Sequence, residues 1–87
     1  MAAEAKKQTE GEQEAYFQLV YKAAVRMYLG KEYEKSLDYY KKVIAFYEQH
    51  DSDAAQGNLA QCHKGMGNVL SAMKNYAMAK EEYMLAL

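Results

Sequence analysis

An internal repeat constrains this 87-residue chain more than any other feature of its sequence. Segments 32–40 and 75–83 carry the same pattern 43 residues apart: an aromatic residue, a small residue three positions later, and a tyrosine four positions after that. The matching residues are Tyr33, Ser36 and Tyr40 in the first segment and Tyr76, Ala79 and Tyr83 in the second. Steps of three and four residues keep side chains on one helical face. A repeat of this length predicts a solenoid of helical hairpins.

The rest of the chain also has the spacing of amphipathic helices. Apolar residues recur at helical intervals through four segments, and no proline interrupts them. We expect helices over residues 12–29, 32–50, 53–73 and 76–87. Gly30 would end the first helix in a left-handed C-cap, any residue of the acidic turn 51–53 could cap the third, and Asn75 would cap the fourth. The short connections predict antiparallel neighbours.

These segments define one all-α domain. Residues 1–11 contain no large hydrophobe after Met1, and we expect them to form a flexible lead-in. Residues 12–87 then form a single domain, with one hairpin over 12–50 and a second over 53–87. A chain of this length supports at most one compact core, so the two hairpins should share it.

Each helix has a face that we expect to point inward. The larger residues on these faces are Tyr16, Phe17, Val20 and Met27, then Tyr33, Leu37, Tyr40, Val43, Ile44 and Tyr47, then Leu59, Cys62, His63, Met66, Val69, Leu70 and Met73, and finally Tyr76 and Tyr83. Small residues between them would let the helices approach closely, and these are Ala24, Ser36, Gly67 and Ala79. Gly57, Gly65 and Gly67 lie inside the third helix, where each glycine costs about 1 kcal/mol against alanine. We therefore expect close packing to explain all three glycines.

Charge and cysteine content exclude several classes of partner and compartment. The 11 basic and 12 acidic residues leave a net charge of −1, which gives no electrostatic case for binding nucleic acid or an anionic membrane. Cys62 is the only cysteine, so an internal disulfide is impossible and a reducing compartment is expected. No apolar run has the length of a membrane span, and the N-terminus lacks the apolar core of a signal peptide. We expect a cytoplasmic protein and leave a nuclear location open.

The sequence offers no set of residues for catalysis or metal binding. His50, Cys62 and His63 lie on different elements or point apart around a helix, and no third ligand has metal-site spacing. We interpret Cys62 as a small hydrophobe, His63 as a packed core residue, and Glu81 with Glu82 as a solvated face. The chain is therefore expected to be no enzyme and to need no cofactor and no metal.

The pattern resembles the tetratricopeptide repeat (TPR). That hairpin motif has a large residue, then Leu-Gly and an aromatic, and later Ala-x₃-aromatic. The second unit matches it as His63-x₂-Met66-Gly67-x₂-Leu70 followed by Ala79-x₃-Tyr83. The first matches more loosely as Val20-x₂-Ala23-Ala24-x₂-Met27 followed by Ser36-x₃-Tyr40. A histidine replaces the tryptophan, the closing proline is absent, and the repeat exceeds the usual length of about 34 residues. Such long repeats are similar to those of the mitotic-spindle adaptors of LGN type.

The resemblance implies a four-helix, two-repeat TPR-type solenoid whose first helices line a concave groove. The groove residues that it implies are Gln18, Tyr21, Val25, Tyr28, Gln61, Lys64, Asn68 and Ser71. Lys64 and Asn68 project from one helical face and resemble part of the carboxylate clamp of chaperone-binding TPR domains, although a plain solvated face is the alternative. The implied function is a protein-binding scaffold that holds a peptide or helix of a partner protein.

The C-terminal helix suggests a structural alternative. Met78, Met84, Leu85 and Leu87 would leave apolar surface uncovered at the end of the last hairpin. Exposed apolar patches mark interaction sites, so the chain could instead form a homo-oligomer through this helix. Self-assembly is therefore the alternative to peptide binding.

Overall fold

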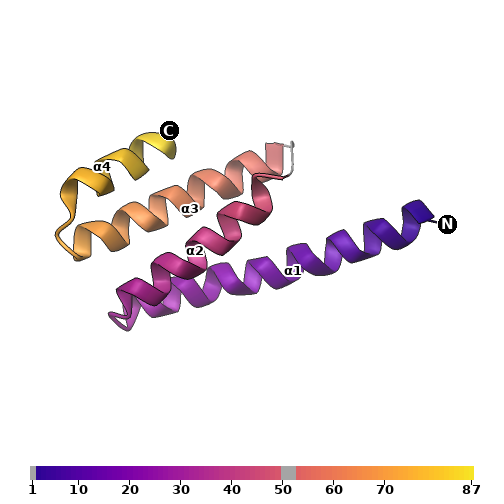
Figure 1. The fold of residues 1–87 in the computed structure, drawn as a ribbon, viewed down its shortest axis with the longest axis horizontal. Coiled ribbons are helices and arrows are strands. Elements are labelled where there is room, and N and C mark those ends of the chain that lie inside the picture. The colour runs from indigo at the N-terminus through magenta and orange to yellow at the C-terminus, as the bar shows by residue number, and fades with distance from the viewer. Residues whose placement is uncertain (1, 50–52) are drawn as a thin grey trace.

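The computed structural model describes residues 2–49 and 53–87, with side chains from Gly11 onward, and within these ranges its regular secondary structure is all helical (Figure 1). The helices are α1 (Ala2–Leu29), α2 (Tyr33–Tyr47), α3 (Asp53–Ala72) and α4 (Tyr76–Leu85). The predicted all-α class is confirmed, and α2, α3 and α4 begin within one residue of their predicted starts. His50 and the first two residues of the predicted acidic turn lie outside the described residues.

The first helix begins ten residues earlier than predicted. We expected it to start at Glu12, after a flexible lead-in, but α1 is helical from Ala2. Alanine, glutamate, lysine and glutamine dominate this segment, and all four are strong helix formers. The prediction missed this part because it relied on an apolar face, which a segment with high intrinsic propensity does not need.

The helices pack as successive neighbours along the chain. α1 packs on α2, α2 on α3 and α3 on α4, while α1 and α3 share a smaller contact. Figure 1 shows this order, with α2 between α1 and α3 and with α4 on the far side of α3. The molecule measures 50 × 25 × 13 Å, so its thinnest dimension is close to the diameter of one helix. Its radius of gyration of 14.0 Å exceeds the roughly 12 Å expected for a compact domain of this length.

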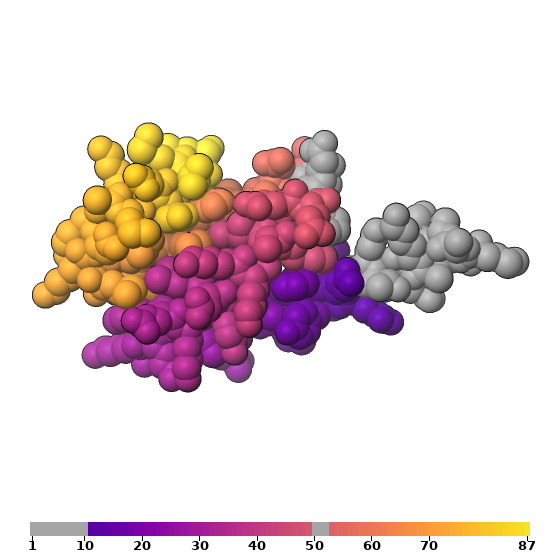
Figure 2. Space-filling view, viewed as in Figure 1, coloured from indigo at the N-terminus to yellow at the C-terminus, as the bar shows by residue number. Residues whose placement is uncertain are grey.

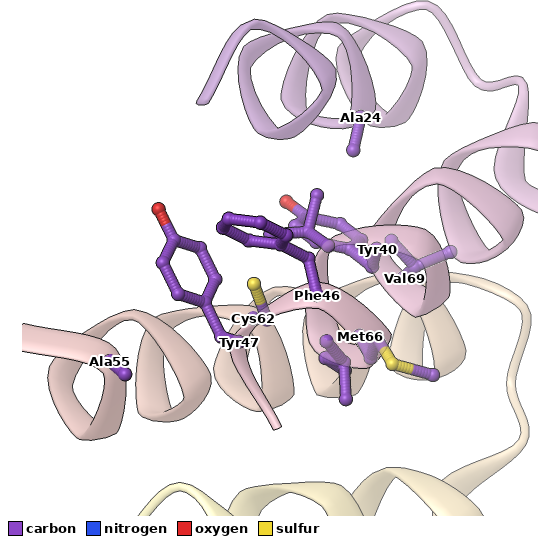
Figure 3. Packing of buried hydrophobic residues seen from close by; sticks show 10 residues of the cluster. Ala24, Tyr40, Phe46, Tyr47, Ala55, Cys62, Met66 and Val69 are labelled. Carbon is purple, nitrogen blue, oxygen red and sulfur yellow. The ribbon is translucent and has the colours of Figure 1, made fainter. Parts of the chain in front are cut away.

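The core lies between α1, α2 and α3. Its buried residues are Ala24, Tyr40, Val43, Ile44, Phe46, Tyr47, Ala55, Cys62, Met66 and Val69. Figure 3 shows several of them filling the space between the helix that carries Ala24 and α3. Phe46, which the sequence pattern did not mark as inward, stacks on Phe17 with ring centroids 4.5 Å apart. The close packing expected at Ser36 is confirmed, because this residue is fully buried and donates a hydrogen bond to the Ala24 carbonyl at 2.7 Å.

Four large residues that we expected to face inward are exposed instead, namely Tyr16, Met73, Tyr76 and Tyr83. Tyr16 keeps 61% and Tyr76 keeps 65% of its surface accessible. The repeat explains the exposure of Tyr76: Tyr33, its equivalent, packs against Tyr28 with ring centroids 6.1 Å apart. The position equivalent to Tyr28 in the second unit is Ser71, which offers Tyr76 no ring to pack against. The repeated tyrosine, Tyr76, therefore does not make the ring contact that Tyr33 makes.

The internal repeat extends to the backbone of the two hairpin turns. Lys31 and Lys74, which are 43 residues apart, both adopt the left-handed conformation, with φ of 64° and 65°. Amides after each turn reach back to the preceding helix: Glu32 N–H donates to Met27 at 2.8 Å and Asn75 N–H donates to Leu70 at 2.8 Å. This six-to-one bond, with a Lys31 bond to Tyr28 and a matching Lys74 bond to Ser71, is a Schellman C-cap. The two hairpins thus turn in the same way.

The turns correct two predictions about helix caps. Gly30 does not adopt the left-handed conformation, because its N–H still donates to Arg26 within the helical pattern and the left-handed residue follows it. Asn75 does occupy the N-cap position of α4, but its side chain makes no capping hydrogen bond. The Asn75 Nδ2 donates to the Met78 sulfur at 3.1 Å instead.

Glycine at either left-handed position is expected to stabilise the protein. The left-handed conformation costs a residue with a Cβ roughly 1–2 kcal/mol in steric strain. Glycine avoids this strain but loses more conformational entropy on folding. We expect Lys31→Gly and Lys74→Gly each to raise the free energy of unfolding in urea by about 0.5–1 kcal/mol. Lys41→Gly, an exposed substitution inside α2, should lower it by about 1 kcal/mol. Equal losses in all three variants would contradict the assigned turn geometry.

The glycines of α3 divide into two kinds. A Cβ on Gly65 would lie 2.5 Å from the Tyr40 ring, and one on Gly67 would lie 2.7 Å from the Tyr83 ring. Close packing therefore explains these two glycines, as expected. Gly57 contradicts the expectation, since a Cβ there would have no atom within 4 Å. No described side chain packs against α3 at that position.

Candidate functional site

A groove runs between α1 and α3 and has residues of α2 as its floor. It consists of two cavities of ≈ 210 and ≈ 230 Å³ that share Tyr21 and so lie next to each other. The first, which we name the Tyr28 pocket, is lined by Tyr21, Val25, Tyr28, Leu29, Tyr40, Gln61, Lys64, Gly65 and Asn68. The second, the Tyr47 pocket, is lined by Gln18, Tyr21, Lys22, Val43, Tyr47, Asn58 and Cys62. Together we call them the α1–α3 groove.

The structure brings most of the implied groove residues together. The α1–α3 groove is lined by seven of the eight, namely Gln18, Tyr21, Val25, Tyr28, Gln61, Lys64 and Asn68. Ser71 lines neither cavity, and its carbonyl accepts the Lys74 N–H of the following turn. The TPR resemblance therefore selected residues of α1 and α3 that line the same groove.

The sequence pattern missed the floor of the groove. Tyr40, Val43 and Tyr47 of α2 line it, at steps of three and four residues along one face. This spacing marked the three residues as inward but could not show that they reach the space between α1 and α3. Lys22 and Asn58 were also missed, because both are polar residues beside the implied positions.

The charges on the groove differ in sign from the charge of the chain. Among the residues whose side chains the structure describes, Lys22 and Lys64, both exposed, are the only charged ones that line the two cavities. The whole chain carries a net charge of −1. The α1–α3 groove is therefore a locally basic surface with aromatic walls.

One member of the implied Lys64–Asn68 pair already has a partner within the chain. Tyr83 of α4 donates a hydrogen bond from its hydroxyl to Asn68 Oδ1 at 2.6 Å. Asn68 therefore helps to hold α4 on α3, and its Oδ1 is not available in the way that the resemblance implied. Lys64 is the member of the pair that is exposed at the groove.

Three tyrosines of the groove, Tyr21, Tyr40 and Tyr47, have raised pKa values. Burial raises the pKa of Tyr40 to about 12 and also raises the pKa of Tyr21 above its ordinary value. For Tyr47, burial again raises the pKa, against a smaller lowering by the nearby Gln18 amide. A phenol with a raised pKa stays neutral near pH 7 and can donate a hydrogen bond.

The hydroxyl of Tyr47 lacks a hydrogen-bond partner among the described residues. The residue is only 4% exposed, and its Oη is buried. Gln18 lies near enough to influence the phenol but not in hydrogen-bonding geometry. In Figure 3 this hydroxyl and the Cys62 sulfur both point toward the side on which α1 lies. An unpaired buried hydroxyl costs about 1–3 kcal/mol, so its presence in a cavity wall calls for an explanation.

Cys62 is expected to be an unreactive thiol. It is 1% exposed, and burial raises its pKa to about 12. Because the thiolate is the reactive form, only about one molecule in ten thousand would be ionised at pH 8. We expect Ellman's reagent at pH 8 to modify the native protein at least about a hundredfold more slowly than the urea-unfolded protein. Equal rates in the two states would show that the thiol is accessible.

A polar pair joins α3 to α4. It consists of His63, which we expected to be a packed core residue, and Glu82, which we expected on a solvated face. His63 Nδ1 lies 2.7 Å from Glu82 Oε2, and both side chains are partly buried. His63 is therefore not an apolar core residue, and Glu82 is not part of a solvated face with Glu81. Glu82 is partly buried because it lies on the same inward side of α4 as Ala79, which is 2% exposed.

Neither a metal-binding cluster nor a membrane-spanning helix is found among the described residues. Residues 2–49 and 53–87 hold no group of three or more histidine, cysteine, aspartate or glutamate side chains placed to bind a metal ion. No helix within these ranges is both long enough and apolar enough to cross a membrane. No family model matches the chain, and neither a curated protein nor a solved structure matches it.

Proposed function

We propose that this protein is a non-enzymatic interaction module that binds a peptide segment of a partner protein in the α1–α3 groove. The observation that carries the proposal is the meeting, along two adjoining cavities, of seven residues that the TPR resemblance implied. Aromatic walls with a few polar groups suit peptide recognition, because rings supply contact area and polar groups supply orientation.

The dimensions of the groove suit an extended segment. Its α1 wall runs from Gln18 to Leu29, which corresponds to about 16 Å of helix. An extended chain rises about 3.3 Å per residue, so this wall could contact about five residues of a peptide.

A TPR-type solenoid of the long-repeat variety is the architecture that we propose for this module. Three features support it: the 43-residue repeat, the matching turns at Lys31 and Lys74, and the small residues that let paired helices approach. Packing mainly between successive helices is also characteristic of repeat proteins. A protein of this design would work in the cytoplasm or nucleus as a scaffold.

Selection from a library of random displayed peptides tests the proposal. Peptides enriched on the native protein should lose at least about tenfold in affinity for Lys64→Glu, because this variant reverses a charge on the groove wall. Lys41→Glu makes the same change on an exposed part of α2 that lines neither cavity, and it should bind like the native protein. The absence of enriched peptides, or equal losses in both variants, would refute groove binding.

Self-association through α4 is a second candidate function. Met84, Leu85 and Leu87 are exposed, and the end of α4 borders an open cavity of ≈ 440 Å³ that is also lined by Leu59 and Ala60 of α3. Figure 2 shows the C-terminal residues, in yellow, at the outer edge of the molecule. Sedimentation over a range of concentrations should then reveal a dimer that Leu85→Glu abolishes. A monomer at every concentration would exclude this function.

A further inference from the structure

We propose that the Tyr47 pocket binds the side-chain carboxylate of a glutamate in the partner peptide. This inference rests on the proposed function, since it names the residue class that one end of the α1–α3 groove recognises. It is carried by the unpaired Tyr47 hydroxyl, the charge of the pocket and the depth at which the hydroxyl lies.

The first step concerns the hydroxyl itself. Tyr47 is almost completely buried, yet its Oη forms no hydrogen bond with a described residue, while the residue lines an open cavity of ≈ 230 Å³. Buried polar groups in native proteins are nearly always paired. A ligand that enters the cavity and accepts a hydrogen bond from Tyr47 would give this hydroxyl the partner that it lacks.

The second step identifies the chemistry of that ligand. Within the described part of the chain, Lys22 is the only charged residue that lines the Tyr47 pocket, and Gln18 adds an amide that can donate. Asn58 also lines the cavity, but its Nδ2 already donates to the Ala54 carbonyl at 2.9 Å. A phenol, an amide and an ammonium group are all donors, and an ionised carboxylate is the side-chain group that only accepts.

The negative charge of Glu14, which raises the pKa of Tyr47, opposes an anionic ligand at the hydroxyl. Glu14 influences Tyr47 electrostatically, but it is exposed and lines neither cavity. Tyr47 itself remains neutral, because burial raises its pKa, so the phenol attracts a carboxylate rather than repelling it. A lysine or arginine side chain would meet Lys22 and leave the donors of the pocket without an acceptor.

Depth selects glutamate over aspartate. The Tyr47 hydroxyl is buried on an almost fully buried residue, and Val43, which is 1% exposed, lines the same cavity. A carboxylate on two methylenes reaches further than one on a single methylene, and the extra methylene can contact the apolar wall. Glutamate therefore fits both the polar and the apolar lining of the pocket.

An NMR titration with a blocked glutamate, N-acetylglutamate N-methylamide, tests the inference directly. We expect dose-dependent shifts of Gln18, Lys22 and Tyr47 resonances, and affinity for the matching glutamine compound that is weaker by about tenfold or more. Tyr47→Phe should bind the glutamate compound about tenfold or more weakly, with an unchanged or higher melting temperature, because it removes an unpaired hydroxyl. A purely structural role for the hydroxyl predicts the opposite change in melting temperature.

Lys22→Gln provides a second variant, since this exposed residue can change without disturbing the core. It should weaken glutamate binding, whereas Lys41→Gln should not. The inference is overturned if the glutamate compound leaves the pocket resonances unshifted, if the glutamine compound binds as well, or if Tyr47→Phe binds normally.

The two proposals fail in different ways. Library peptides that need Lys64 but contain no required glutamate would preserve groove binding and refute the glutamate pocket. A library that yields no peptide would refute the proposed function, while the titration would still decide whether the pocket accepts a carboxylate.

Discussion

Replacing Gly65 with alanine is expected to lower the free energy of unfolding by about 2 kcal/mol, although alanine is the better helix former. The new Cβ would lie 2.5 Å from Cζ of Tyr40, a distance that real side chains do not show. Tyr40 cannot easily yield, because it is buried and its ring packs edge-on against Tyr21 with centroids 5.7 Å apart. The cost of moving this ring should exceed the gain of about 1 kcal/mol in helix propensity.

Gly57→Ala provides the matched control within the same helix. A Cβ at that position meets nothing within 4 Å, so only the propensity gain applies. We expect this variant to raise the free energy of unfolding by up to about 1 kcal/mol. Urea denaturation monitored by circular dichroism measures both variants. Shifts of the same sign would mean that α2 and α3 do not approach each other at Gly65.

Replacing Leu70 with alanine should destabilise the protein by about 2–5 kcal/mol. Leu70 is 3% exposed, so truncation leaves a cavity in addition to the lost apolar burial. A domain of this length is stable by about 4–13 kcal/mol in total, so the loss would be a large share of its stability. The variant should show this loss in the midpoint of urea denaturation.

Leu19→Ala is the control for this experiment. This substitution makes the same chemical change on α1, but Leu19 is 64% exposed. The free energy of unfolding should therefore change by no more than about 0.5 kcal/mol. Similar losses of stability at both positions would contradict the burial of Leu70 in the core and the exposure of Leu19 on the outer side of α1.

Helix positions and groove walls were accessible from local sequence pattern. Steps of three and four residues specify which side chains share a helical face, and this rule located the starts of α2, α3 and α4. The same rule, combined with the resemblance, selected the side chains of α1 and α3 that line the α1–α3 groove. It could not place the groove floor, because the contribution of Val43 and Tyr47 depends on how α2 crosses beneath both walls.

The internal repeat shows where local pattern stops being sufficient. Lys31 and Lys74 adopt the same left-handed conformation, but Tyr33 and Tyr76 have different environments because Tyr28 is replaced by Ser71 in the second unit. A repeated residue keeps its backbone role, whereas its burial depends on the residue opposite.

The internal repeat follows from sequence alone, and so do the helical class of the chain and the inward positions of α2 that Tyr40, Val43 and Tyr47 occupy. These are local properties, since a helix forms from residues that are neighbours along the chain. Other features appear only when the helices pack. These are the pairing of His63 with Glu82, the hydrogen bond from Tyr83 to Asn68 and the unpaired hydroxyl of Tyr47. Each depends on a distance between residues of different helices, and no spacing along one helix specifies that distance.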